Sequence, residues 1–169
     1  MKASKIRGAM SVMHEDLFSK YEDFANLSHF LEKWTRDELN IKGAFLRLTN
    51  RFSEKNRVVL SFVPRPSISY SLRAGIKGED ETVKLVSLVD IVDDDPDSKW
   101  LSVCFYDDCV TDPAEEGNMV PKGVLGIDGY CFDLFENNEG IITYLEQRID
   151  EAYENSLTSR SHAGAWEQG

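Results

Sequence analysis

The sequence predicts a mixed α+β fold, because its apolar residues follow a helical period near both ends of the chain and a strand period between them. We expect an N-terminal helical segment, about six mostly antiparallel strands in one curved sheet, and a C-terminal helix. The 169 residues are enough for one domain with its own core. Residues 1–12 are predicted as a flexible leader, 13–156 as the single domain and 157–169 as a flexible tail.

Two segments carry the helical period. Between residues 16 and 39, large apolar side chains recur at steps of three and four, as on a helix that buries one face. Asn26 or Ser28 could cap a second helix within this segment, so one helix and two short helices both remain open. Residues 138–155 carry a similar apolar stripe and predict the C-terminal helix.

The period changes to two after Gly43, and this alternation is typical of strands that bury one face. Short connections favour antiparallel neighbours, since a parallel crossover needs about a dozen residues or more. The stretch 107–127 is predicted as a long loop. The predicted strands are 43–51, 57–63, 67–74, 82–92, 99–106 and 128–134.

This order of elements resembles the helix-grip fold, in which a sheet wraps a long C-terminal helix and leaves a cavity between them. The likeness concerns the fold alone and implies no activity. It leaves one alternative function open, namely an enzyme or small-molecule binder that uses such a cavity. Tyr70, Tyr130 and the pair of Arg47 and Arg73 would supply its polar groups.

The charge of the chain argues against two classes of partner. Its net charge of −11 repels nucleic acid phosphates, and no apolar stretch approaches the length that spans a membrane. We therefore predict no nucleic acid partner and no membrane partner. The charge is also unevenly spread: residues 42–78 hold eight basic side chains and one acid, whereas residues 90–116 hold ten acids and one base.

The cysteines predict a reducing compartment. Cys104, Cys109 and Cys131 form no CxxC pair and no recognisable disulfide framework, so we expect three free thiols. The first residues carry no apolar run of signal-peptide length. These observations predict a cytoplasmic protein.

No motif in the sequence specifies a reaction, a cofactor or a metal. The acidic run 93–97 resembles the start of a calcium loop, but Ser98 and Cys104 stand where that loop needs Gly and Glu. His14, His29 and His162 lack the spacing of zinc ligands. We therefore expect no catalytic residues, no metal site and no cofactor.

Alternation divides each predicted strand into two faces. One face is almost purely apolar, includes Val83 and Leu85, and is expected to lie under the helices. The other face, which includes Lys84, mixes aromatic and aliphatic side chains with Ser and Arg. That mixture is typical of interfaces. The candidate binding residues on this face are Phe45, Arg47, Ser69, Ser71, Arg73, Trp100 and Tyr106.

Three explanations of the mixed face remain open. The loop 107–127 folds over it, a second subunit covers it, or it is a surface that binds a small ligand. The sequence thus predicts a small acidic intracellular protein that acts by binding, either to a partner protein or to itself as a homodimer, without catalysis. The process that it serves does not follow from the residues.

Overall fold

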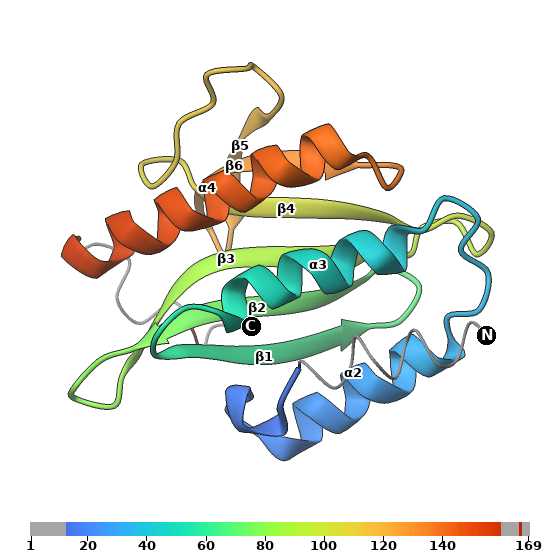
Figure 1. The fold of residues 1–169 in the computed structure, drawn as a ribbon, viewed down its shortest axis with the longest axis horizontal. Coiled ribbons are helices and arrows are strands. Elements are labelled where there is room, and N and C mark those ends of the chain that lie inside the picture. Colours follow the sequence, from blue (N-terminus) through green and yellow to red (C-terminus); the bar gives the residue numbers. More distant parts are fainter. Residues whose placement is uncertain (1–12, 160–165, 167–169) are drawn as a thin grey trace.

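The computed structural model describes residues 13–159 and Trp166. It contains a six-stranded antiparallel sheet, N-terminal helices and a C-terminal helix, so the predicted α+β fold is confirmed (Figure 1). The predicted leader 1–12 and most of the predicted tail lie outside the described residues. The elements are the 3-10 helix η1 (Glu15–Leu17), helices α2 (Tyr21–Lys33) and α3 (Ile41–Ser53), strands β1 (Val58–Arg65), β2 (Ser69–Lys77), β3 (Val83–Val92), β4 (Trp100–Tyr106), β5 (Asn118–Val124) and β6 (Ile127–Leu134), and helix α4 (Glu139–Thr158).

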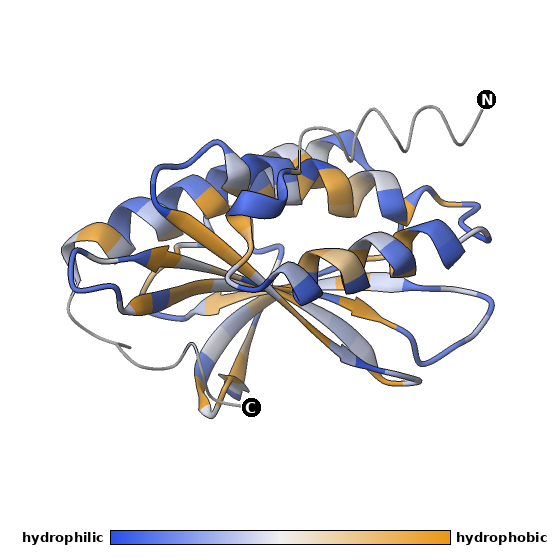
Figure 2. Ribbon diagram, turned by 90° about the horizontal axis from the view of Figure 1, so that it is seen from below, coloured by the Kyte–Doolittle hydropathy of each residue, from blue (hydrophilic) through white to orange (hydrophobic). Residues whose placement is uncertain are grey.

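The helices lie together on one side of the sheet, which is strongly twisted (Figure 2). The strand order is β1-β2-β3-β4-β6-β5, so β1 and β5 are the edges. Each large apolar side chain buried under the helices stabilises the fold by about 1.5–3 kcal/mol. One fully buried row crosses the sheet on that side through Phe62, Leu72, Val89, Val103 and Phe132.

Residues 43–51, predicted as a strand, lie within helix α3, so this prediction is wrong. The same residues belong to a helical stripe with steps of three and four, and tertiary packing selects the helix. The Asp37 carboxylate stabilises the start of α3, because it accepts hydrogen bonds from the backbone N–H groups of Ile41 and Lys42 at 2.7 and 3.0 Å. The buried residues of the stripe are Ile41, Phe45, Leu48 and Phe52.

The N-terminal segment forms one α-helix, α2, preceded by the short η1. Asn26 and Ser28, considered as caps of a second helix, both lie inside α2, where the Ser28 hydroxyl donates to the Phe24 carbonyl at 2.9 Å. The C-terminal helix agrees with its prediction, and Asn138 caps it by accepting from the N–H of Ile141 at 3.2 Å.

The predicted loop 107–127 contains a strand that the sequence analysis missed. Residues 118–124 form the edge strand β5, which pairs with β6 and has a register shift between Val120 and Val124. The rest of the loop packs beside α4: the Thr111 hydroxyl donates to Glu151 at 2.8 Å, and the Asp112 carboxylate accepts from the hydroxyls of Tyr130 and Tyr144. Pro121 and Gly123 interrupt the alternation of side chains that predicts a strand.

The faces predicted for the start of β3 are wrong, because the register of β2 against β3 shifts between Ala74 and Gly75. Before the shift, Lys84 pairs with Ile76 and its ammonium donates to the carbonyls of Ser156 and Ser159 at the C-terminal end of α4. Lys84 therefore lies on the helix side, opposite to its prediction. A bulge inserts one extra residue, and every side chain before it changes face.

Helices α3 and α4 are joined by ion pairs. Arg47 contacts Glu139 at 2.5 Å and Glu146 at 2.6 Å, and Arg51 pairs with Asp150. The hydrogen bonds to these carboxylates raise the pKa of Arg47 further above its usual range. Basic residues of the 42–78 segment thus meet acids of α4 within the same chain.

The edge of β1 is blocked at three positions. The Leu60 carbonyl accepts from the N–H of Ser19 at 2.9 Å, and the N–H of Phe62 donates to the Asp23 carboxylate at 3.3 Å. Pro64 has no N–H to offer. These features reduce the number of unpaired backbone groups through which edge strands associate.

Within the described residues, no helix combines the length and apolar composition needed to cross a membrane.

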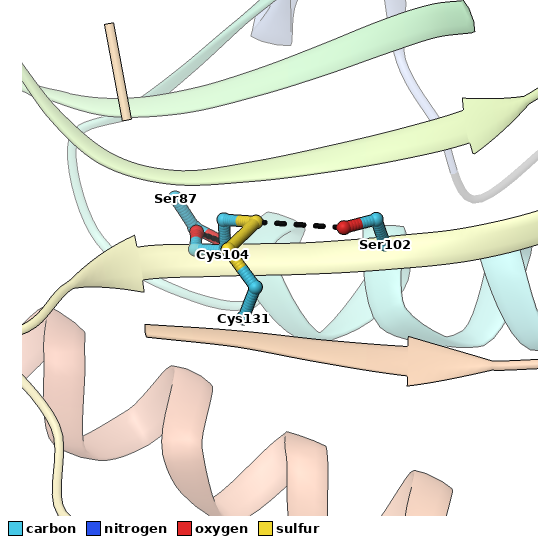
Figure 3. Close-up of a disulfide and its surroundings, with 4 residues drawn as sticks. All are labelled: Ser87, Ser102, Cys104 and Cys131. Atoms are coloured by element: carbon cyan, nitrogen blue, oxygen red, sulfur yellow. Dashed lines mark hydrogen bonds between the residues drawn. A yellow bond between two sulfur atoms is a disulfide. The ribbon is translucent and has the colours of Figure 1, made fainter. Parts of the chain in front are cut away.

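Two of the cysteines form a disulfide, so the prediction of three free thiols is wrong. Cys104 on β4 and Cys131 on β6 lie directly opposite each other, with Cα atoms 4.2 Å apart (Figure 3). Cys109 is free and buried. The sequence could not show the pairing, because the register of β4 against β6 was unknown. The argument for a reducing compartment therefore retains only Cys109.

The disulfide is tested by counting thiols in protein purified and unfolded without a reductant. We expect one labelled thiol, Cys109, before reduction and three afterwards. A cross-link over this sequence separation contributes about 2–4 kcal/mol, so reduction should lower the denaturation midpoint. Cys131→Ser should give the same midpoint with and without reductant. Three labelled thiols without reduction would contradict the disulfide.

Candidate functional site

The side of the sheet that carries no described helix is the surface on which most of the candidate residues lie; we call it the helix-free face. Paired strand residues share a face, which places Arg73 of β2 beside Leu88 of β3, and Ser71 beside Asp90. The two central rows of the helix-free face are Ser61, Arg73, Leu88, Cys104 and Cys131, and Val63, Ser71, Asp90, Ser102 and Asp133.

A buried polar cluster occupies the β2–β3 part of the helix-free face. Ser69, Ser71 and Arg73 are all buried, and the Ser69 hydroxyl accepts from the Arg65 guanidinium at 3.1 Å. Burial raises the pKa of Asp90, although the hydrogen bond from Ser71 and the two guanidinium groups oppose the shift. The Oδ1 atom of Asp90 is buried and has no hydrogen-bond partner among the described residues.

Trp166, from the C-terminal part of the chain, packs onto this face. Its ring lies over Gly75: a Cβ atom there would be 2.9 Å from ring atoms of Trp166 and 2.5 Å from Val83. Its backbone carbonyl accepts a long hydrogen bond of 3.5 Å from the Arg73 guanidinium. The missing side chain at Gly75 thus lets the indole approach the sheet closely.

Trp100 and Tyr106 occupy two other parts of the helix-free face. The Trp100 ring packs against Phe135 with centroids 5.1 Å apart and planes tilted by 30°, and its indole N–H donates to Asp94 at 3.2 Å. Phe135 is 59% exposed. Tyr106 is only 1% exposed, and this burial raises its pKa to about 12.

Two candidate residues lie elsewhere. Phe45 is completely buried in α3 and belongs to the core, and Arg47 pairs with α4. Both errors follow from predicting residues 43–51 as a strand. The loop 107–127 was one predicted cover for the helix-free face. Its hydrogen bonds to Glu151, Tyr144 and Tyr130 instead hold it beside α4 and β6.

A cleft of about 460 Å³ lies on the helix side, between α2 and the adjoining ends of β1 and β2. Phe30 is at its centre, with ring centroids 4.0 Å from Tyr70, 5.9 Å from Trp34 and 6.2 Å from Phe62. The Phe62 and Tyr70 rings are nearly parallel, at 14°. These four aromatic rings form an apolar wall of the cleft, and we call the whole site the aromatic cleft.

Charged side chains surround the aromatic cleft. Lys99 pairs with Asp93 at 3.3 Å, and its ammonium lies 5.8 Å from the centre of the Trp34 ring. Lys33 is exposed and has no ion-pair partner among the described residues. Burial, and then the Asp93 carboxylate, raise the pKa of Tyr70.

Sequence reasoning missed the aromatic cleft as a site, although Tyr70 had been considered for a cavity under the C-terminal helix. The described cleft is beside α2 instead, while Ile142, Leu145 and Ile149 of α4 are fully buried in the core. One signal was present in the sequence: Phe30 and Trp34 are four residues apart and share a helix face.

Among residues 13–159 and Trp166, no three His, Cys, Asp or Glu side chains converge in a way that could hold a metal ion. The acidic run 93–97 instead contacts protein groups, as in the pair of Asp97 with Arg36 at 2.6 Å. No family model matches this chain, and no curated protein or solved structure matches it either.

Proposed function

We propose that this protein acts by binding a segment of a partner protein on its helix-free face, without catalysing a reaction. The observation that carries the proposal is the position of Trp166, whose indole packs over Gly75 beside Arg73. Tryptophan is enriched at the centres of protein interfaces, where it fills a pocket and excludes water. The helix-free face thus accepts an indole-bearing segment, and the chain itself supplies an example.

The polar cluster offers such a segment hydrogen bonds as well as apolar contact. Arg73 is 6% exposed and already donates to one backbone carbonyl, that of Trp166. The Oδ1 atom of Asp90 would accept a backbone N–H of the bound segment. Buried polar atoms are rarely left unsatisfied in native proteins, so a donor from a partner fits this position.

The chain's own tryptophan competes with any partner. An intramolecular ligand acts at an effective concentration of the order of millimolar, so a partner segment must bind more strongly than the tail to displace it. The protein is therefore proposed to be a binding module that weakly binding segments do not occupy.

The proposal is tested with a synthetic peptide that has the sequence of residues 159–169. Full-length Trp166→Ala protein should bind this peptide, because the helix-free face is then unoccupied by its own indole. Wild-type protein should bind it at least about tenfold more weakly, a difference of about 1.4 kcal/mol. Fluorescence anisotropy of the labelled peptide measures both affinities.

The control peptide carries Ala in place of Trp166 and should bind neither protein. Failure of the tryptophan peptide to bind the Trp166→Ala protein would reject the proposed function. Equal binding of both peptides would reject it too, because the indole would then contribute nothing.

A homodimer is the second candidate, and the contact between Trp100 and Phe135 favours it. An exposed phenylalanine packed on a half-buried tryptophan at the end of a sheet is typical of association surfaces. The uneven charge of the chain would give two copies complementary patches to exchange, but Arg47 and Arg51 of the basic segment already pair within the chain.

Sedimentation velocity tests the dimer with Trp100→Glu. We expect a wild-type dimer and a folded monomeric variant, because burying an unpaired carboxylate in an interface costs several kcal/mol. Tyr21→Glu, which replaces an exposed aromatic residue on α2, should remain dimeric. A monomeric wild type would exclude the homodimer and leave the partner segment as the proposed function.

A further inference from the structure

The aromatic cleft has the size and lining of a small-molecule site. Its volume of about 460 Å³ falls within the range of about 300–1,000 Å³ in which ligand pockets lie. Phe30, Trp34, Phe62 and Tyr70 present ring surfaces to this volume, and such surfaces favour offset or edge contacts with another aromatic ring. The apolar part of a fitting ligand is therefore a planar ring system.

The charges around the aromatic cleft oppose those of the whole chain. Two ammonium groups, Lys33 and Lys99, and one carboxylate, Asp93, line it, which gives a local charge of +1 with His29 neutral. The chain as a whole carries −11. An excess of one ammonium group among the lining residues favours an anion, and the charge of +1 matches a monoanion.

Lys42 offsets the partial negative charge at the C-terminal end of α2, which would otherwise disfavour an anion in the cleft. The C-terminal end of α2 points its last carbonyls toward the region of Trp34, and such an end carries partial negative charge. The buried Lys42 ammonium donates to the carbonyls of Leu31, at 2.9 Å, and of Trp34. It also lies 5.7 Å from the centre of the Trp34 ring, so it adds positive potential under the cleft wall.

We propose that the aromatic cleft binds a small planar aromatic carboxylate. The ring packs against Phe30 and Tyr70, and the carboxylate lies at the mouth of the cleft near Lys33. This site is separate from the helix-free face, so the inference does not depend on the proposed function.

Three probes of similar size test the inference in titrations of the full-length protein followed by calorimetry and by amide NMR shifts. We expect 2-naphthoate to bind and to shift the amide NMR signals of residues in the aromatic cleft. Decahydro-2-naphthoate, which has the charge and the ring skeleton without the aromaticity, and 2-naphthylmethylammonium, which has the aromatic ring with the opposite charge, should each bind at least about tenfold more weakly.

A charge reversal at the cleft provides the decisive variant. Lys33 is exposed, so Lys33→Glu preserves the core, and it changes the local charge of the cleft from +1 to −1. We expect 2-naphthoate to bind this variant about tenfold more weakly and 2-naphthylmethylammonium to bind it more tightly than wild type. Lys20→Glu makes the same change of net charge at the other end of α2 and should leave both affinities unchanged.

Three results would overturn the inference: no binding of 2-naphthoate to wild type at millimolar concentration, equal binding of decahydro-2-naphthoate, or equal weakening by Lys33→Glu and Lys20→Glu. The first result would show that the cleft is not a binding site. The second would show that it has no preference for an aromatic ring, and the third that the local charge does not select the ligand. None of them affects the peptide test of the helix-free face.

Discussion

The structure depends on one constraint: a sheet has two faces, and this chain places the described helices on one of them. The row from Phe62 to Phe132 is sealed under the helices and forms the centre of the core. The opposite face must be stabilised by other means, and the chain uses a disulfide, a buried polar cluster and a single docked tryptophan. Both proposed binding sites follow from this asymmetry.

The aromatic cleft arises where the helical layer is incomplete. Helices α3 and α4 are joined by the ion pairs of Arg47 and Arg51, whereas α2 packs against β1 at the edge of the sheet. Phe30 and Trp34, near the end of α2, line the cleft that remains between this helix and the sheet. Lys33 and Lys99 line the same cleft.

Much of the fold could be predicted because alternation is a direct consequence of burying one face of a strand. Five of the six predicted strands are strands in the structure, and the C-terminal helix is where its stripe placed it. Helix α3 was missed because its residues satisfy two periods at once, and only packing decides between them. Strand β5 was missed because it is an exposed edge strand with few buried apolar side chains. For the site, alternation located Ser69, Ser71 and Arg73 correctly, whereas the disulfide and the aromatic cleft depend on the register and packing of distant segments.

The blocked edge of β1 limits how copies of this protein can join. Growth of a continuous intermolecular sheet requires two reactive ends on every unit, as does growth of a polymer chain. Ser19, Asp23 and Pro64 make one of those ends less reactive. A unit with one reactive end adds a single neighbour and terminates the chain, so this arrangement favours pairs of molecules joined through β5 over a fibre.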